Sequence, residues 1–257
     1  MSAPQAIVTG AASGIGAAVA LRLAGAGYAV HAVGLDEAGL AATTAAIAAA
    51  GGQARATLLD VADEAARAAF FATLDGAAGD PGAGPLKVLV NCAAILGQAA
   101  AAPALDAPLG HFRRVIEVNL TAAFAWSQAA ARRMGSGGAI VHVSSVGGSA
   151  AQWHAAAYCA AKAGLDSLAR SMAVEWAPLG IRVNALAPGD IRTATTDAQA
   201  GAVARGQAPA SPLARMTPLG RQGTPGEMAE VVAFLVSDSA SFVTGTTLRA
   251  DGGFLSY

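Results

Sequence analysis

Short apolar runs and longer alanine-rich stretches alternate along the whole of this chain. The runs are rich in Val, Ile and Leu and predict β-strands, whereas the stretches between them have the length of helices. We expect strands at 5–10, 28–34, 54–61, 87–93, 138–145, 181–189 and 246–253. We expect helices at 15–27, 37–50, 63–75, 111–134, 156–177 and 224–237. Because parallel neighbours need a crossover connection, the alternation predicts an α/β fold with a doubly wound parallel sheet and helices on both faces.

Composition narrows the class of protein. The 257 residues suit a single domain spanning 1–257, and 54% hydrophobic residues are too many for a disordered chain. The net charge of −1, without a basic stripe, argues against nucleic acid as a partner. Cys92 and Cys159 lie at no metal-ligand spacing, so no metal site is expected. No signal peptide or membrane span is recognisable, which favours a soluble protein of the cytoplasm.

A glycine-rich segment, TGAASGIG at 9–16, joins the first expected strand to the first expected helix. Gly10, Gly14 and Gly16 allow a sharp turn and a close backbone approach to a ligand. The following helix offers free N–H groups and a positive dipole end to an anion. A plain glycine turn is the alternative, but the position between strand one and helix one favours a nucleotide.

The segment YCAAK places Tyr158 four residues before Lys162, on one face of an expected helix. A free tyrosine has a pKa near 10 and is a poor base at neutral pH, whereas a nearby ammonium favours the phenolate. Ser145 is at the end of the fifth expected strand, at the sheet edge where open α/β folds bind ligands. Each of these residues taken alone also has a purely structural explanation. Tyr–Lys pairs at this spacing, for example, are common on helix surfaces.

The glycine spacing is G-x-x-x-G-x-G, and it resembles that of the short-chain dehydrogenase/reductase family. The resemblance covers nearly the whole chain and is nearest to the 3-oxoacyl-reductase-like and glucose-dehydrogenase-like members. It also rests on the segments LDV (59–61), NCAA (91–94), NL (119–120), VSS (143–145), NALAPG (184–189) and DGG (251–253). The resemblance implies a Rossmann-type sheet of about seven strands and hydride transfer between NAD(P) and a secondary alcohol or ketone.

The resemblance also implies roles for four residues. Tyr158 is the general acid/base, and Lys162 lowers its pKa and binds ribose. Ser145 positions the substrate oxygen, and Asn119 completes a proton relay through its helix and a water. Ser144 is the rival serine, although the interval to the tyrosine favours Ser145. A Ser–His hydrolase using His142 or His154 is disfavoured because the segment HVSSV lacks the G-x-S-x-G elbow.

The resemblance also implies which residues of this chain contact the cofactor. The residues are Gly10, Ser13, Gly14, Ile15, Gly16, Asp36, Asp60, Val61, Asn91, Ala93, Ala94, Tyr158, Lys162, Pro188, Gly189, Ile191 and Thr193. Two departures matter: Gly34 stands where NAD-dependent members carry Asp, and Leu35 where NADP-dependent members carry Arg. No Lys or Arg occurs at 29–54, and Asp36 and Glu37 would repel a 2′-phosphate, so NAD is favoured over NADP. Asp36 is equally suited to capping the next helix.

Specificity is expected at 190–215, a small and polar stretch that the resemblance makes a substrate lid. Arg192, Arg205 and Arg215 could hold an anionic substrate or be solvated charges. Residues 152–154, of sequence QWH, could line the substrate pocket or form a surface turn, and His142 is expected to be a hydrogen-bonded core residue. The substrate is a small molecule, and the resemblance implies a homo-oligomer, often a tetramer.

Three other functions are weighed against an NAD-linked dehydrogenase. The first is an NADPH-dependent reductase of 3-oxoacyl thioesters or ketones. The second is a nucleotide-binding regulatory protein without turnover, which the intact Ser145, Tyr158 and Lys162 set argues against. The third is a lyase or epimerase, which the fold alone does not exclude.

Overall fold

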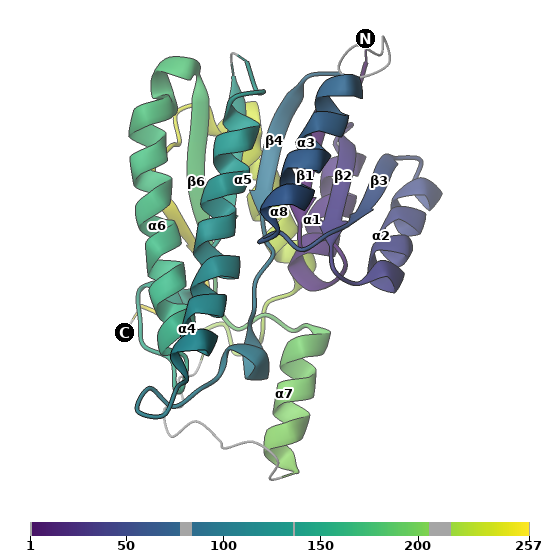
Figure 1. Ribbon diagram of the computed structural model, residues 1–257. Coiled ribbons are helices and arrows are strands. Elements are labelled where there is room, and N and C mark those ends of the chain that lie inside the picture. The colour runs from purple at the N-terminus through teal and green to yellow at the C-terminus, as the bar shows by residue number, and fades with distance from the viewer. Residues whose placement is uncertain (1, 78–83, 136, 206–216, 257) are drawn as a thin grey trace.

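The computed structural model describes residues 2–77, 84–135, 137–205 and 217–256. Within them, seven strands form one sheet in the order β3-β2-β1-β4-β5-β6-β7, and all neighbouring strands are parallel (Figure 1). The strands are β1 (Gln5–Thr9), β2 (Ala29–Gly34), β3 (Gln53–Leu58), β4 (Leu86–Asn91), β5 (Gly138–Val143), β6 (Ile181–Pro188) and β7 (Thr247–Ala250). The α/β class and the doubly wound parallel sheet are therefore confirmed.

The helices connect these strands. The α-helices are α1 (Gly14–Gly25), α2 (Glu37–Ala49), α3 (Glu64–Ala77), α4 (Leu109–Ile116), α5 (Ala122–Ala131), α6 (Ala156–Trp176), α7 (Ala194–Ala204) and α8 (Pro225–Val236). Short 3-10 turns are η1 (Gly97–Ala100), η3 (Val146–Gly148), η4 (Ala177–Leu179) and η5 (Asp238–Ala240), and η2 (Glu117–Thr121) is a π-helical turn. None of the described helices combines the length and the apolar character that a membrane crossing requires.

Two apolar cores lie on opposite faces of the sheet. One packs α1, α2 and α8 against it through residues such as Leu23, Ile47 and Leu235. The other packs α3, α5 and α6 against it, with Phe71 and Trp126 among its largest buried side chains. Figure 1 shows α3, α5 and α6 in front of the sheet and α1 and α8 behind it. Burial on both faces explains why the central strands are nearly continuous apolar runs.

The order of the strands creates a crevice. β1 and β4 are neighbours, but the chain leaves β1 towards β2 and leaves β4 towards β5, so the two connections run in opposite directions along the sheet. In open α/β sheets, ligands bind in the crevice that such a switch point leaves beyond the carboxyl ends of the strands. The β1–α1 loop and the segment after β4 flank this crevice.

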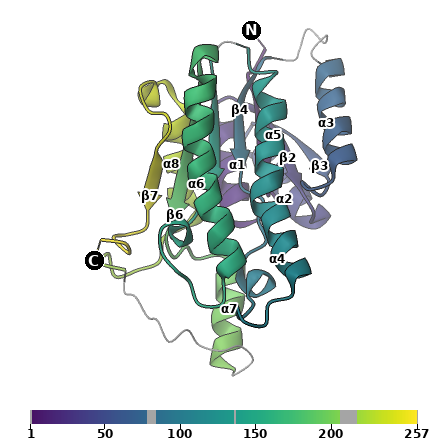
Figure 2. The same cartoon turned by 60° about the vertical axis from the view of Figure 1, so that its left-hand side comes forward.

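Two segments differ from the expectation. The single helix expected at 111–134 is α4, the π-turn η2 and α5 in succession. The stretch at 190–215 contains a regular helix, α7, whose start carries a capping box: Thr193 accepts a hydrogen bond from the Thr196 N–H, and the Thr196 hydroxyl accepts one from the Thr193 N–H. Figures 1 and 2 show α7 beyond the carboxyl ends of the strands, at the opposite end from the N-terminus.

Candidate active site

The glycine-rich loop forms a tight cradle at the crevice. Gly10 and Gly14 have φ of +68° and +53°, which side chains rarely adopt. A Cβ on Gly16 would lie 2.1 Å from the carbonyl oxygen of Gly10. The loop therefore requires glycine at these positions, for its backbone conformation and its close approach.

Helix α1 begins directly in this cradle. Ser13 is its N-cap residue but makes no side-chain cap hydrogen bond, and the first turn holds no acidic residue. Ile15 is the second residue of the helix. The N–H groups of the first turn can thus meet an anionic ligand, which fits the phosphates of a dinucleotide.

The segment that follows β4 packs against the end of β1 and the glycine loop. The Thr9 hydroxyl accepts hydrogen bonds from the backbone N–H groups of Cys92 (3.1 Å) and Ala93 (3.2 Å). A Cβ on Gly10 would lie 2.8 Å from the Cα of Ala93. Ala93 therefore lies beside the glycine loop, and Ala94 is the next residue of the same segment.

Lys162 is deeply buried beside Tyr158 on α6. Its side chain is 3% exposed; its Nζ donates to the carbonyl oxygen of Val143 at 2.7 Å and lies 5.5 Å from the centre of the Tyr158 ring. Burial lowers the pKa of Lys162 to about 8. The expected pair is thus assembled at the carboxyl end of β5 and is no surface contact.

The expected effect of this lysine on the tyrosine requires a correction. Burial raises the pKa of Tyr158 above its usual value, and the hydrogen bond with Ser145 opposes this shift. The phenol is therefore neutral at physiological pH, because burial disfavours the phenolate by more than the Ser145 hydrogen bond favours it. In this state Tyr158 is a proton donor.

The two serines after β5 point to different partners. Ser145 bonds to Tyr158, as its effect on that pKa shows, and its Oγ accepts from the N–H of Gly147 at 3.0 Å. The hydroxyl of Ser144 donates to the carbonyl oxygen of Lys162 at 3.1 Å. Ser145 is therefore the serine that shares the site with Tyr158.

Asn119 lies in the π-turn η2 and is 1% exposed. Its Oδ1 accepts from the N–H of Ile95 at 2.7 Å, and its Nδ2 donates to the Ile95 carbonyl oxygen at 2.9 Å. The side chain thus fixes the segment after β4. π-turns within helices are frequent at functional sites.

Three expected cofactor contacts have strong partners within the chain. Asp60 accepts from Ala62 N–H and pairs with Arg114 at 2.5 Å, and the carbonyl of Val61 accepts from the indole of Trp126 at 3.0 Å. The amide of Asn91 donates to Ser127 at 2.9 Å and faces α5. Asn91 can therefore offer the crevice only its backbone.

Asp36 is exposed at the N-cap position of α2 and makes no side-chain cap hydrogen bond. A Cβ on Gly39 would lie 2.7 Å from Asp36 Oδ2 and 2.5 Å from the carbonyl oxygen of Ala12. The carboxylate is therefore beside the glycine loop. Leu35, which precedes it, is 68% exposed and provides no cation.

The segment after β6 crosses in front of the glycine loop. Pro188 ends β6, Gly189 donates its N–H to the Ala250 carbonyl at 3.1 Å, and Ile191 is buried. A Cβ on Gly14 would lie 3.5 Å from Thr193 Cγ2. The structure thus brings Thr193 next to the glycine loop.

The charges expected around the lid have other contacts or fall outside the described residues. Arg192 lies 3.7 Å from Asp197, and both are exposed. Arg205 is the C-cap residue of α7, and Arg215 lies outside the described part of the chain. Among the described residues, neither Arg192 nor Arg205 is shown in contact with Ser145, Tyr158 or Lys162.

Residues 152–154 approach the site from the β5–α6 connection. Trp153 is 48% exposed and stacks on His154, with ring centres 4.7 Å apart. His154 has φ of +57° and its carbonyl accepts from the N–H of Ala102 at 2.7 Å. A Cβ on Gly147 would lie 3.1 Å from the Gln152 amide, which places this segment next to Ser145.

His142 is buried, as expected, but only one of its ring nitrogens has a partner. Its Nδ1 lies 3.2 Å from Asn91 Nδ2, whereas Nε2 makes no hydrogen bond to the described residues. Burial lowers its pKa to about 4, so the ring is neutral at physiological pH. The expectation of a fully hydrogen-bonded ring is therefore wrong for Nε2.

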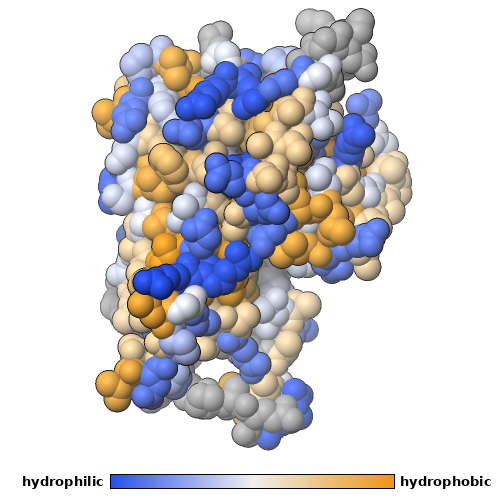
Figure 3. All heavy atoms as spheres, viewed as in Figure 1, coloured by the Kyte–Doolittle hydropathy of each residue, from blue (hydrophilic) through white to orange (hydrophobic). Residues whose placement is uncertain are grey.

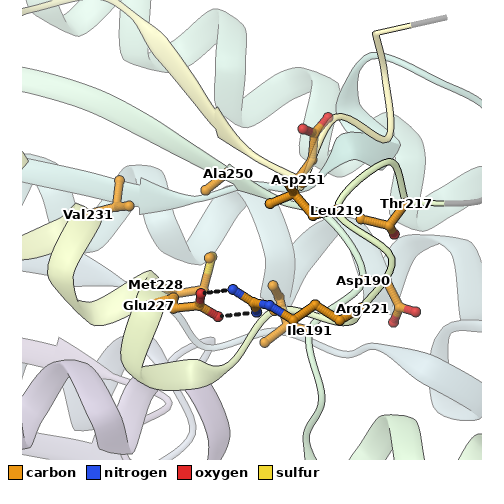
Figure 4. A pocket seen from close by; sticks show the side chains of 12 residues that line it. Asp190, Ile191, Thr217, Leu219, Arg221, Glu227, Met228, Val231, Ala250 and Asp251 are labelled. Atoms are coloured by element: carbon orange, nitrogen blue, oxygen red, sulfur yellow. Dashed lines mark hydrogen bonds and ion pairs between the residues drawn. The ribbon is translucent and has the colours of Figure 1, made fainter.

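A cavity of about 210 Å³ is lined in part by Ile191 of the segment after β6. Ser145, Tyr158 and Lys162 are not among its lining residues. Asp190, Arg221, Glu227 and Asp251 are among its lining residues (Figure 4). Arg221 pairs with Glu227 at 2.6 Å. The described residues contain no group of three or more His, Cys, Asp or Glu that could hold a metal ion.

A phosphate cradle at a switch point, next to a buried Tyr–Lys pair, defines a dinucleotide-dependent oxidoreductase.

Comparison with known proteins supports this class. A family model described as enoyl-(acyl carrier protein) reductase matches residues 10–255. The cis-4-hydroxycyclohexanecarboxylate dehydrogenase of Sinomonas cyclohexanicum is 44% identical over 255 residues, which cover 97% of this chain and 95% of that protein.

Solved structures with a similar fold are oxidoreductases as well. A short-chain type dehydrogenase/reductase from Mycobacterium marinum has a TM-score of 0.86 at 34% identity, covering 98% of this chain and 96% of the other. A variant of actinorhodin polyketide ketoreductase with NADPH has a TM-score of 0.88 at 30% identity, covering both chains fully. The chain belongs to the short-chain dehydrogenase/reductase family, as an NAD(P)-dependent enzyme of alcohols and ketones.

Proposed function

We propose that this enzyme interconverts a secondary alcohol and its ketone with NAD as the preferred cofactor. The observation that carries the proposal is the contact of Ser145, Tyr158 and buried Lys162 at the carboxyl edge of the sheet, beside the glycine cradle. When bound, the nicotinamide accepts or supplies a hydride. The protein's own residues manage the proton and the substrate oxygen.

Each site residue then has a separate task. Tyr158 donates a proton to the carbonyl oxygen in reduction and accepts the hydroxyl proton in oxidation. Ser145, which is hydrogen-bonded to Tyr158, holds the same oxygen. Lys162 supplies a cation that stabilises the phenolate formed when Tyr158 has given up its proton. Asn119 keeps the segment after β4 in place and takes part in proton exchange with solvent.

The preference for NAD rests on Asp36. Its exposed carboxylate lies beside the glycine loop, where it can accept hydrogen bonds from ribose hydroxyls and repel a 2′-phosphate. Leu35 provides no positive charge for such a phosphate. The NADPH-bound polyketide ketoreductase shows that related chains take the other cofactor.

The function is tested by steady-state kinetics with NAD and NADP on a panel of secondary alcohols. The panel begins with cis-4-hydroxycyclohexanecarboxylate, the substrate named for the 44% identical relative. We expect turnover, with kcat/KM at least about tenfold higher for NAD, because one repelled charge is worth roughly 1–2 kcal/mol at short range.

Two variants test whether the charge of Asp36 causes the preference for NAD. Asp36→Asn removes the charge and should reduce the NAD preference to within about threefold. Glu175→Gln, which removes an exposed carboxylate near the carboxyl end of α6, is the control and should leave the preference unchanged. A higher kcat/KM with NADP in the unmodified enzyme would contradict the Asp36 argument and favour a biosynthetic reductase.

We also propose that residues 190–215, of which 206–215 lie outside the described part of the chain, form a lid over the substrate. The support is the position of α7, which lies beyond the carboxyl ends of the strands and contacts η1 next to the crevice. Closure of such a segment would exclude water from the reacting atoms.

The enzyme is further proposed to work in the cytoplasm as a homotetramer. Large apolar side chains are exposed on helices, among them Phe124 on α5, Val174 on α6 and Phe234 on α8. Figure 3 shows apolar and charged side chains interleaved over the face formed by α3 to α6. We expect sedimentation equilibrium to give four times the chain mass of 25.1 kDa, and a monomer mass would refute the assembly.

A further inference from the structure

The loop between β5 and α6 is held at both of its ends by the site. Residues 146–155 connect Ser145 to α6, which carries Tyr158 in its first turn, and the two side chains are hydrogen-bonded. The Gly147 N–H donates to Ser145 Oγ at 3.0 Å, and a Cβ on Gly147 would lie 3.1 Å from the Gln152 amide. The far part of the loop therefore folds back beside Ser145. Figures 1 and 2 show the start of α6 at the same end of the sheet as α7.

His154, in this loop, has a strained backbone. Its φ is +57°, and among the described residues it is the one residue other than glycine with a positive φ. Its carbonyl oxygen accepts from the Ala102 N–H at 2.7 Å, and Ala155 forms a parallel bridge with Ala102. The segment before α4 thus fixes this conformation from outside the loop. Strain that is fixed in this way is typical of ligand-binding sites.

The imidazole of His154 supports the indole of Trp153. The two rings are stacked, with centres 4.7 Å apart and an angle of 26° between their planes. Such a stack favours one orientation of the indole. Trp153 is nevertheless 48% exposed, whereas Trp126 is fully buried and Trp176 packs against the core. The loop therefore holds a large flat apolar ring in a fixed orientation, with one face on His154 and much of its surface open.

A fixed indole favours a particular shape of ligand. A saturated six-membered ring can lay one whole face against it, and the C–H groups of that face meet the negative face of the aromatic system. An open chain with the same number of carbons must first give up its internal rotations to make a similar contact. A rigid aromatic wall beside Ser145 therefore discriminates by shape between cyclic and open-chain alcohols.

We propose that Trp153 is a specificity-determining residue that selects a secondary alcohol within a saturated carbon ring, and that His154 is the positioning residue that holds the indole. The inference rests on the function proposed above, in which Ser145 and Tyr158 hold the reacting oxygen, and it names the substrate class of that site. The carbon that carries the hydroxyl lies at Ser145 and Tyr158, and the rest of the ring packs against the indole.

Kinetics with two six-carbon alcohols test the selection. We expect kcat/KM to be at least about tenfold higher for cyclohexanol than for 3-hexanol, within the range that apolar contacts provide. Trp153→Leu should reduce this ratio to within about threefold, chiefly through a higher KM for cyclohexanol, because the lost contact is made before and during the reaction. The kcat/KM for 2-propanol, which is too small to reach the indole, should change by less than about twofold.

Trp176→Leu is the matched control. It makes the same change at the last residue of α6, at the opposite end of the helix from Tyr158, and should leave the ratio unchanged. An unchanged ratio in Trp153→Leu would overturn the proposal. An equal fall of the ratio in Trp176→Leu would also overturn it, because the effect would then not be specific to the loop.

Two variants of His154 test the role of the stack. His154→Gly removes the ring at a backbone conformation that glycine adopts freely, and should raise the KM for cyclohexanol by at least about threefold while kcat is kept. His154→Phe keeps an aromatic ring beneath the indole and should keep the KM within about twofold. A normal KM in His154→Gly would contradict the positioning role.

Binding without turnover separates this inference from the proposed function. Cyclohexanol is titrated by calorimetry into the enzyme saturated with NADH, a mixture that cannot react because alcohol and cofactor are both reduced. We expect Trp153→Leu to raise the Kd by about tenfold. If the Kd responds in this way but no alcohol or ketone is turned over, the proposed function fails and the ring site stands. If 3-hexanol is oxidised as well as cyclohexanol, the function stands and the selection by Trp153 is refuted.

Discussion

Tyr158→Phe will lower kcat by at least about 10²-fold, the low end of the contribution of general acid–base catalysis. The change removes one hydroxyl and keeps the ring that packs beside Lys162. Without the hydroxyl, Ser145 loses its partner in the site, and the group proposed to exchange a proton with the substrate oxygen is gone. Cofactor affinity, followed by nicotinamide fluorescence, should change by less than about threefold, because the glycine cradle is untouched.

Tyr28→Phe is the matched control. It makes the same chemical change at a partly buried tyrosine next to Asp238 and Arg182, and it should leave kcat unchanged. If Tyr158→Phe kept more than a tenth of the turnover, Tyr158 would not be the acid/base. An equal loss in both variants would point to a general effect on folding.

Gly16→Ala will weaken cofactor binding by at least about 10²-fold. The added Cβ would lie 2.1 Å from the Gly10 oxygen and 2.7 Å from the Gly10 carbon, both of them backbone atoms that no rotamer change can move away. The loop must therefore shift, and its N–H groups lose their alignment with the phosphates. Titration with NADH and NADPH measures the loss, and circular dichroism checks that the fold is kept.

Gly25→Ala provides the comparison within the same helix. A Cβ at Gly25 meets no atom within 4 Å, so this variant should bind the cofactor normally. Its free energy of unfolding should rise by about 0.5 kcal/mol, because alanine loses less backbone freedom than glycine in a helix. Normal binding by Gly16→Ala would contradict the assignment of the cradle.

Local patterns in the sequence were sufficient for much of the fold. Alternating apolar runs and alanine-rich stretches located the strands and most helices, and the glycine spacing located the cradle. The placement of Tyr158 and Lys162 followed from a separation of four on one helix. Helix α7 was missed because its composition is small and polar, although Thr193 and Thr196 form a capping box that could have indicated its start.

Contacts between distant residues could not be predicted in the same way. The Arg114–Asp60 ion pair joins residues 54 positions apart, and the direction of the Asn91 side chain depends on which face of β4 meets α5. The pKa of Tyr158 depends on how deeply the folded chain buries the phenol, which the spacing to Lys162 does not reveal.

The Thr9 hydroxyl, which accepts from Cys92 and Ala93, joins parts of the chain that are more than 80 residues apart. The cradle is therefore complete only when both halves of the sheet have folded, and an unfolded chain has no partial version of it to offer. Cofactor affinity is thus linked to the stability of the entire sheet: at a concentration of about 100 times Kd, the cofactor would add roughly 2.7 kcal/mol to the free energy of unfolding. In a cell, the abundance of this enzyme would then follow the supply of its own cofactor, since an empty chain unfolds and is degraded more often than a loaded one.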